Sequence, residues 1–326
     1  MTVEPLRTRE LGTSGIKITT VGLGCWQFSG GKGIIGGYWG RVDPAEIRKI
    51  VETSIAGGIN WFDTAEAYGF GRSERALSDA LQELSVEPGT VVVATKWLPF
   101  LRTAGSISRT FPTRRDALAP FGVDLHQIHA PASLAGIRAQ MSAMADLLDE
   151  GEIRAVGVSN FSADQMRRAD DALRARGHRL SANQVRFSLL DRDIEKNGVL
   201  DAARERGITI IAYSPLAQGL LTGRFHENPE LIRSRPGPRR FMGRFKESNL
   251  LRTEPLVNEL ATVAQVHAAT AAQVALAAIV QGFGDTVVAI PGATKARHAE
   301  QNAEAIALEL TRVELDRIWS RARDLE

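Results

Sequence analysis

Eight short apolar runs alternate with longer stretches of helical periodicity along almost the whole chain, and this alternation limits the fold more than any other feature of the sequence. Short runs rich in valine, isoleucine and other apolar residues are typical of strands that are buried on both faces. The sequence therefore predicts eight strands, which span residues 19–24, 59–65, 91–96, 123–130, 155–160, 181–187, 209–215 and 286–292.

The stretches between these runs carry helix start and stop signals. One helix is expected to begin with Asp43 as N-cap and Pro44 in its first turn. Another begins at Ser162 and stops at Gly177, and a third stops at Gly207. Eight β-then-α units at roughly even spacing in 326 residues fit a parallel (β/α)₈ barrel better than an open doubly wound sheet.

We expect one barrel domain over residues 1–326 with two additions. Residues 11–19 resemble a hairpin before the barrel, turning at 13–15 and closing one end. The interval 216–245 is too long for a routine connection after the seventh strand, and such a loop is usually functional or disordered. No predicted strand is followed by the Gly-x-Gly-x-x-Gly turn of a dinucleotide-binding half-domain.

Composition narrows the class of partner. The chain has 40 Lys+Arg and 38 Asp+Glu, a formal net charge of +2, which predicts neither a nucleic-acid partner nor a surface for an acidic partner. A small-molecule partner is expected, and no membrane partner. Cys25 is the only cysteine, which fits a reducing compartment. The start resembles no signal peptide, and the apolar runs are shorter than the ~20 residues of a spanning helix, so a cytoplasmic location is expected. The oligomeric state stays open between monomer and homo-oligomer.

Chemically capable side chains stand at the ends of the predicted strands. In a parallel barrel these ends meet on one rim, where barrel enzymes carry their active sites. The sequence therefore predicts that five such side chains converge, namely Asp63, Lys96, His129, Asn160 and Tyr213.

In its successive motifs the chain resembles the aldo-keto reductase family, in the right order and over essentially its whole length. The motifs are FDTAEAYGFGRSE, VATK, QIHAP, VGVSNF, AYSPLAQGLLTGR and IPGATKARHAEQNAEA. The resemblance implies a (β/α)₈ reductase of aldehydes or ketones that binds NADPH without a Rossmann fold. It also implies a catalytic tetrad of Asp63, Tyr68, Lys96 and His129.

Elementary chemistry supports the same four roles. Hydride arriving at a carbonyl carbon leaves an oxyanion, and a tyrosine of reference pKa ~10 holds a proton at neutral pH that it can release to that oxygen. Tyr68 is the expected acid. A lysine ammonium stabilises the phenolate, which fits Lys96, and a carboxylate keeps that lysine charged, which fits Asp63. His129 would hydrogen-bond and polarise the substrate oxygen.

The resemblance also carries over a cofactor site. It puts Ser159, Asn160 and Gln184 on the nicotinamide carboxamide and Tyr213 on the ring, with the segment after it along the pyrophosphate. The expected substrate pocket contains Trp26, Tyr68, Trp97 and His129. The full set of expected cofactor residues is Cys25, Trp26, Asp63, Ser159, Asn160, Gln184, Tyr213, Ser214, Pro215, Leu216, Gln218, Gly219, Leu221, Arg224, Pro291, Gly292, Thr294, Lys295, His298, Gln301 and Asn302.

A preference for NADPH is expected from the segment after the eighth strand. The resemblance puts Thr294, Lys295 and His298 near the adenosine 2′-phosphate, with Arg297 as a nearby reserve cation. A helix starting around Ala296 would add its N-terminal N–H groups. His298 stands where many relatives have arginine. The preference for NADPH over NADH should therefore depend on Lys295, and it should increase as the pH falls toward 6.

Two alternative functions stay open at the level of sequence. A Schiff-base aldolase would use Lys96 as a deprotonated nucleophile. A non-catalytic family member would retain the fold and the cofactor as a regulatory or partner-binding subunit. His126 and His129 point to opposite faces of a strand, so we expect no metal site and assign His126 no role.

The substrate is not specified by these motifs, and neither is the direction of the reaction. Ala130 stands where relatives often carry a larger residue, which predicts a roomier pocket. Candidates for apolar pocket walls are Trp26, Tyr38 and Trp39, together with the segment 97–105 after Lys96.

Overall fold

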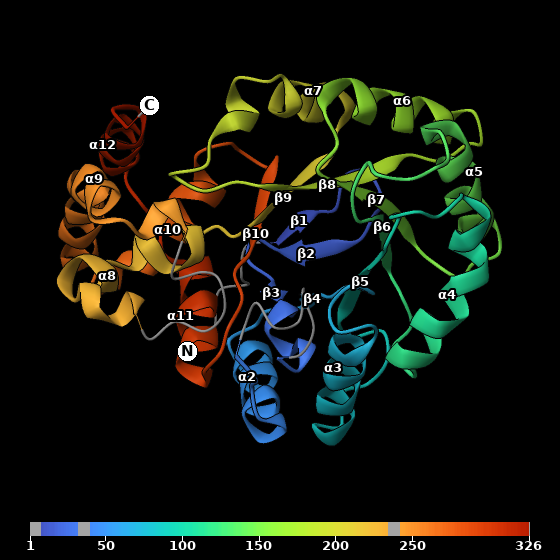
Figure 1. Ribbon diagram of the computed structural model, residues 1–326, viewed down its shortest axis with the longest axis horizontal. Coiled ribbons are helices and arrows are strands. Elements are labelled where there is room, and N and C mark those ends of the chain that lie inside the picture. Colours follow the sequence, from blue (N-terminus) through green and yellow to red (C-terminus); the bar gives the residue numbers. More distant parts are fainter. Residues whose placement is uncertain (1–7, 32–39, 234–241, 326) are drawn as a thin grey trace.

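The computed structural model describes residues 8–31, 40–233 and 242–325. The chain begins with an antiparallel hairpin of β1 (Thr8–Glu10) and β2 (Lys17–Thr19). Leu11 N–H donates to the Ile16 carbonyl at 2.8 Å across the turn. The predicted N-terminal hairpin is therefore confirmed, and it lies across one end of the barrel (Figure 1).

In the described part of the chain, eight parallel strands form one sheet, in which each strand pairs with the next one along the chain. Isolated parallel bridges Val21–Ala289 and Gly24–Gly292 then join the first barrel segment to the last. The predicted (β/α)₈ barrel is confirmed. Its strands are β3 (Leu23–Gly24), β4 (Trp61–Asp63), β5 (Val92–Trp97), β6 (Leu125–Ile128), β7 (Ala155–Ser159), β8 (Leu180–Arg186), β9 (Thr209–Tyr213) and β10 (Val287–Ile290).

Helices surround the strands as an outer layer (Figure 1). The α-helices are α2 (Pro44–Ala56), α3 (Arg72–Glu83), α4 (Gly105–Leu118), α5 (Ile137–Asp149), α6 (Ala163–Arg174), α7 (Val199–Arg206), α8 (Arg224–Glu227), α9 (Glu247–Val266), α10 (Ala271–Gln281), α11 (Ala296–Ala307) and α12 (Arg312–Arg323). No single helix among the described residues has the length and apolar composition to cross a membrane, although α9 and α10 meet that test jointly across a 97° bend.

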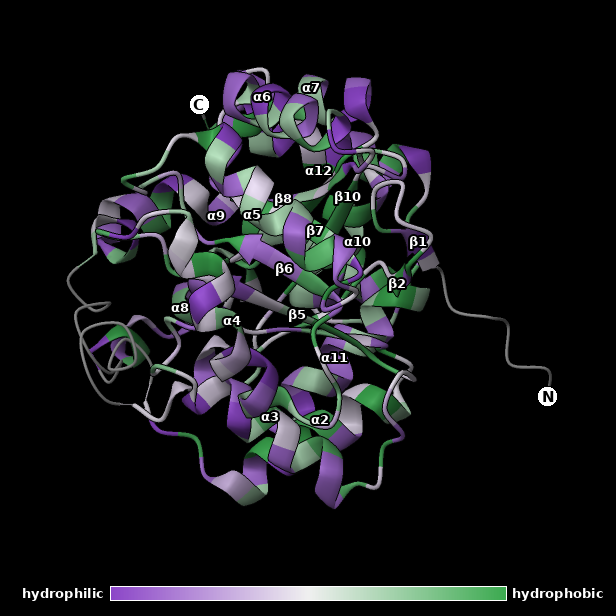
Figure 2. Cartoon of the chain, turned by 90° about the vertical axis from the view of Figure 1, so that its right-hand side faces the viewer, coloured by the Kyte–Doolittle hydropathy of each residue, from purple (hydrophilic) through white to green (hydrophobic). Residues whose placement is uncertain are grey.

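Strand alternation divides the apolar residues into two cores. One set of side chains fills the inside of the barrel, among them Trp61, Val92, Ala94 and Ile211, and the hairpin residue Ile18 packs against this set. The neighbouring positions face outward and form the larger core beneath the helices, whose outer faces are hydrophilic (Figure 2). The hairpin therefore closes the end of the barrel opposite the strands' carboxyl ends.

Several helix signals act as predicted. Asp43 accepts from Ala45 N–H at 2.9 Å, and Ser162 forms a capping box with Gln165. Gly207 ends α7 in the left-handed conformation with φ 64°. Before α7, Gly198 at φ 78° separates it from the short 3₁₀ helix η2 (Asp193–Glu195), so 193–207 is not one helix.

Six of the eight strands are shorter than predicted, and the first retains only two residues. Residues 19–24 were expected to form one strand, but Thr19 ends the hairpin strand β2 and its N–H donates to Asn60 Oδ1 at 2.8 Å. Only Leu23–Gly24 pairs with β4. Thr19, the first residue of the predicted strand, thus belongs to the hairpin.

The long segment after β9 folds into short helical turns. They are η3 (Ala217–Thr222), α8, η4 (Pro229–Ile232) and η6 (Gly243–Phe245), and residues 234–241 lie outside the described part. Leu231 and Met242 both line the large cavity described below. The described parts of this segment therefore lie against the carboxyl-end face of the barrel.

Candidate active site

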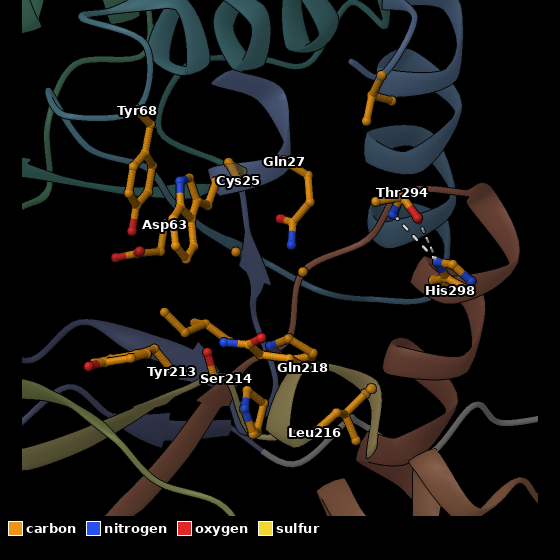
Figure 3. A pocket seen from close by; sticks show the side chains of 18 of the residues that line it. Cys25, Gln27, Asp63, Tyr68, Tyr213, Ser214, Leu216, Gln218, Thr294 and His298 are labelled. Carbon is orange, nitrogen blue, oxygen red and sulfur yellow. Dashed lines mark hydrogen bonds between the residues drawn. The ribbon is translucent and has the colours of Figure 1, made fainter. Parts of the chain in front are cut away.

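A cavity of about 1420 Å³ opens at the carboxyl ends of the barrel strands. Figure 3 shows Tyr68 and Asp63 on one side of it and Tyr213 with Ser214 on another, while Thr294 and His298 lie farther along. The cavity therefore runs from a compact polar centre at the barrel axis to the start of α11.

Three side chains form the polar centre. Lys96, on β5, is fully buried and forms a short ion pair with Asp63, the last residue of β4. Lys96 Nζ also donates to the Thr64 carbonyl at 2.8 Å and lies 3.5 Å from the Tyr68 hydroxyl. Tyr68 lies in the turn after β4, which returns its hydroxyl over the lysine. A carboxylate, an ammonium and a phenol are thus connected in one line.

The charges and the burial of these three side chains favour a protonated phenol beside a charged lysine. Burial raises the pKa of Tyr68, and the Lys96 charge opposes that rise. Burial alone would lower the pKa of Lys96, but the adjacent Asp63 and Tyr68 raise it above its usual value. Lys96 is therefore an ammonium at neutral pH, and Tyr68 holds its proton.

His129 follows β6 and faces the same phenol. Its ring meets the Tyr68 ring edge-on, with centroids 5.6 Å apart. Burial, with the Lys96 charge adding to it, lowers the pKa of His129 to about 3, so the imidazole is neutral at pH 7. Its Nδ1 has no hydrogen-bond partner among the described residues. The Tyr68 ring is stacked on Trp26 on another side, with centroids 5.8 Å apart.

Two glutamines complete the surroundings of Asp63. Gln127 and Gln184 donate to Asp63 Oδ2 at 3.0 and 2.8 Å. Gly157 stands beside Gln127 in the barrel register, and a Cβ there would come within 2.8 Å of the Gln127 side chain. The role of Gln127 was missed in the sequence, although its place two residues before His129 in a predicted strand was a usable signal.

At the next strand ends, Asn160 connects two neighbours. Its amide donates to Ser159 Oγ at 3.0 Å and its Oδ1 accepts from the Tyr213 hydroxyl at 3.0 Å. Gln184 turns its amide group to Asp63, although its side chain also borders the cavity. These side chains offer both donors and acceptors at the cavity wall, which suits a carboxamide.

The backbone after β9 contains four left-handed residues between 214 and 219, and three of them are consecutive. Ser214, Ala217, Gln218 and Gly219 have φ of 53°, 48°, 60° and 96°. Successive turns of this kind direct N–H groups to one side and form anion-binding concavities. Ser214, Gln218 and Gly219 line the cavity, so this segment fits a pyrophosphate.

The far end of the cavity is formed by α11. Lys295 is the N-cap of this helix and supplies no side-chain cap hydrogen bond. Thr294 N–H and hydroxyl each lie 3.4 Å from His298 Nδ1 (Figure 3). Asn302 Nδ2 is buried without a hydrogen-bond partner among the described residues. Donors that face a cavity without partners fit a bound polar ligand.

The family model named "Aldo/keto reductase family" matches residues 20–322 of this chain. The chain belongs to the aldo/keto reductase family.

Relatives and solved structures agree with this assignment. An uncharacterized oxidoreductase of Mycobacterium tuberculosis is 39% identical over 308 residues, covering 94% of this chain and 90% of the relative. The chloroplastic pyridoxal reductase of Arabidopsis thaliana is 33% identical, covering 91% and 81%. The glycerol dehydrogenase of Gluconobacter oxydans superimposes with a TM-score of 0.80 at 26% identity, covering 98% and 96%. Aldo/keto reductases are oxidoreductases that bind a nicotinamide cofactor and act on small carbonyl compounds.

Most of the site residues expected from the aldo/keto reductase motifs line the cavity. Three do not, namely Lys96, Trp97 and Leu221. Those that do are Cys25, Trp26, Asp63, Tyr68, His129, Ser159, Asn160, Gln184, Tyr213, Ser214, Pro215, Leu216, Gln218, Gly219, Arg224, Pro291, Gly292, Thr294, Lys295, His298, Gln301 and Asn302.

The three exceptions have simple causes. Lys96 lies beneath Tyr68 and touches the cavity only through it. Trp97 directly follows Lys96 in a strand, so it points to the other face, where it packs in the outer core and donates to Ser106 at 3.2 Å. The expectation that Trp97 lines the substrate pocket is therefore wrong. Leu221 is fully buried in the same core.

Part of the segment 97–105, which was expected to supply apolar pocket walls, borders the cavity. Leu98 and Phe100 line the cavity after β5. Glu66 supports this loop, accepting from Leu98 N–H at 2.9 Å and from Arg102 at 2.7 Å. Two other aromatic residues were expected as pocket walls, at positions 38 and 39. Both positions lie outside the described residues.

Proposed function

We propose that this chain reduces aldehydes or ketones to alcohols with NADPH. The observation that carries this proposal is the ammonium of Lys96, which lies between the Asp63 carboxylate and the Tyr68 hydroxyl beneath a large cavity. A proton donor stabilised in this way suits a reaction that develops negative charge on an oxygen.

The protein groups would act as follows. His129 and Tyr68 both face the cavity beside one another, so a carbonyl oxygen can accept from both. When bound, the nicotinamide cofactor supplies the hydride. Tyr68 donates its proton to the substrate oxygen, and Lys96 stabilises the phenolate that remains. Asp63 keeps Lys96 charged and is itself held by Gln127 and Gln184.

The cofactor would lie along the cavity. Ser159, Asn160 and Tyr213 suit the nicotinamide end, and the left-handed backbone after Ser214 suits the pyrophosphate. Lys295, at the N-cap of α11, suits the 2′-phosphate.

The direct test is NADPH consumption with a panel of carbonyl compounds. The panel should include small, aromatic, sugar-derived and bulky aldehydes, and also pyridoxal, because a relative is named pyridoxal reductase. We expect saturable NADPH oxidation with at least one class. Tight NADPH binding without turnover on any compound would favour the non-catalytic alternative.

The aldolase alternative has a separate test. A Schiff-base lysine must lose its proton, whereas Asp63 and Tyr68 raise the pKa of Lys96. We expect borohydride to trap no substrate on Lys96. Trapping that requires no NADPH would overturn the reductase proposal.

A neutral His129 makes a prediction about pH. Since its pKa is lowered to about 3, the imidazole keeps one protonation state across neutral pH. We therefore expect kcat for reduction, measured at saturating cofactor and substrate, to show no inflection near the usual histidine pKa of ~6.5. A half-maximal rate near that pH, lost in His129→Asn, would show that His129 titrates during the reaction.

Cofactor preference should depend on Lys295. Replacing Lys295 by alanine removes a charge-assisted contact worth ~1.5–3 kcal/mol, so kcat/KM with NADPH should fall roughly tenfold to a hundredfold while the value with NADH stays unchanged. Lys17→Ala is the matched control, because Lys17 is the same residue type at an exposed position of the hairpin that does not line the cavity. An equal loss with both cofactors would contradict this role.

The structure changes the pH at which His298 is expected to strengthen the preference for NADPH over NADH. Burial, with Arg297, Arg224 and Lys295 adding to it, lowers the pKa of His298. His298 is therefore protonated at lower pH than an ordinary histidine, so any strengthening of NADPH binding by its protonation shifts to lower pH.

A further inference from the structure

An acidic side chain faces the cavity at the start of α11. Glu46, in the first turn of α2, accepts from Ala296 N–H with Oε1 at 2.9 Å. Ala296 is the first residue of α11, and α2 and α11 pack side by side (Figure 1). The Glu46 carboxylate thus occupies the position that an anion would take at this helix N-terminus.

The surroundings of Glu46 are otherwise suited to an anion. Lys49, Arg224 and Lys295 line the same cavity. Asp43 also lines it, and its Oδ1 caps its own helix through Ala45 N–H. The buried amide of Asn302, on α11, borders the cavity with no hydrogen-bond partner among the described residues, a second sign that a ligand completes this end.

We propose that Glu46 is a specificity-determining residue that competes with the 2′-phosphate of NADPH for the N-terminus of α11 and thereby limits the preference for NADPH over NADH. This inference rests on the proposed function. Glu46 takes no part in the chemical steps, because it lies at the far end of the cavity from Tyr68.

The competition follows from charge and geometry. A phosphate oxygen that accepts from Ala296 N–H needs nearly the place that Glu46 Oε1 now holds, since charge-assisted N–H···O contacts are ~2.7–2.9 Å long. The phosphate must therefore displace the carboxylate or bind beside it, and like charges at close range repel. NADH has a ribose 2′-hydroxyl at this point, which can donate to a carboxylate. Glu46 thus acts against NADPH and in favour of NADH.

Glu46→Gln separates charge from hydrogen bonding. The glutamine keeps an oxygen acceptor for Ala296 N–H but removes the negative charge. We expect the ratio of the dissociation constants of NADH and NADPH, measured by fluorescence titration without substrate, to rise about tenfold in favour of NADPH. The same change should appear with 2′-AMP against 5′-AMP. It should shrink in ~1 M salt, where the Debye length is only ~3 Å.

Two further variants keep the test decisive. Glu52→Gln removes the same charge from the same helix at an exposed position that does not line the cavity, so its cofactor ratio should match wild type. Glu46→Ala should also shift the ratio toward NADPH, and it should lower the Tm more than Glu46→Gln does because it uncaps Ala296.

The outcomes distinguish the two proposals. A protein that binds neither cofactor would overturn the proposed function and this inference with it. Binding of both cofactors with an unchanged ratio in Glu46→Gln and Glu46→Ala would overturn only the role of Glu46. A loss of Tm without any change in the ratio would make Glu46 a structural cap alone.

Discussion

Replacing Tyr68 by phenylalanine is expected to lower kcat for carbonyl reduction by at least ~10²-fold, the usual effect of losing a general acid. The change removes one oxygen atom, the one that lies 3.5 Å from Lys96 Nζ. The ring itself remains and can keep its stacking on Trp26. Steady-state rates with the best aldehyde of the panel measure the effect.

The affinity for NADPH provides the control for this variant. Most of the expected cofactor contacts lie on the ends of other strands, so the dissociation constant of NADPH should change little. Reduction at the wild-type rate would refute the acid role. A large loss of NADPH affinity would mean that the ring positions the cofactor.

Replacing Lys96 by methionine should also lower kcat by ~10²-fold or more, because the phenolate of Tyr68 loses its only adjacent cation among the described residues. The Lys96 charge lowers the pKa of Tyr68, so its removal raises that pKa further and makes proton release harder. Rates measured as a function of pH test this expectation.

Stability must be separated from chemistry in this variant. Removing one partner of a buried ion pair typically costs ~3–5 kcal/mol, because the other charge stays buried without compensation. Thermal unfolding should therefore show a lower Tm for Lys96→Met. The double variant Lys96→Met with Asp63→Asn removes that buried charge, so it should recover stability but not activity. An active double variant with the wild-type pH profile would remove Lys96 from the mechanism.

Much of the barrel was predictable because parallel strands impose simple geometry. Alternating apolar runs and helical stretches predicted eight units, and the carboxyl ends of the strands predicted where Asp63, Lys96 and His129 converge. The same geometry also predicts which face of a strand each residue is on. Two-residue periodicity puts Trp97 on the opposite face from Lys96, and it puts Gln127 on the same face as His129. Trp97 was expected in the pocket because it begins the apolar segment after Lys96, and the residue alternation was the better guide.

Other features left no clear signal in the sequence. Glu46 and Ala296 are far apart along the chain, and only the packing of α2 against α11 brings them together. The left-handed conformations of Ser214, Ala217 and Gln218 belong to residue types that rarely adopt them, so glycine positions alone did not reveal the turn. Long-range packing and strained backbone are the two causes of what was missed.

The barrel is a ring whose two ends meet at a joint between residues 20–24 and 289–292. Two isolated bridges and three backbone hydrogen bonds close this joint, whereas the other neighbouring strands pair as ladders. The cavity crosses this joint, with Gly24 and Glu46 on one side and Gly292 and Lys295 on the other. A molecule held there contacts the first and the last unit of the chain at once, and its binding free energy adds to the closure of the ring. Ligand affinity and the integrity of the barrel are consequently linked, so a substitution that loosens the joint weakens binding even when it touches no ligand.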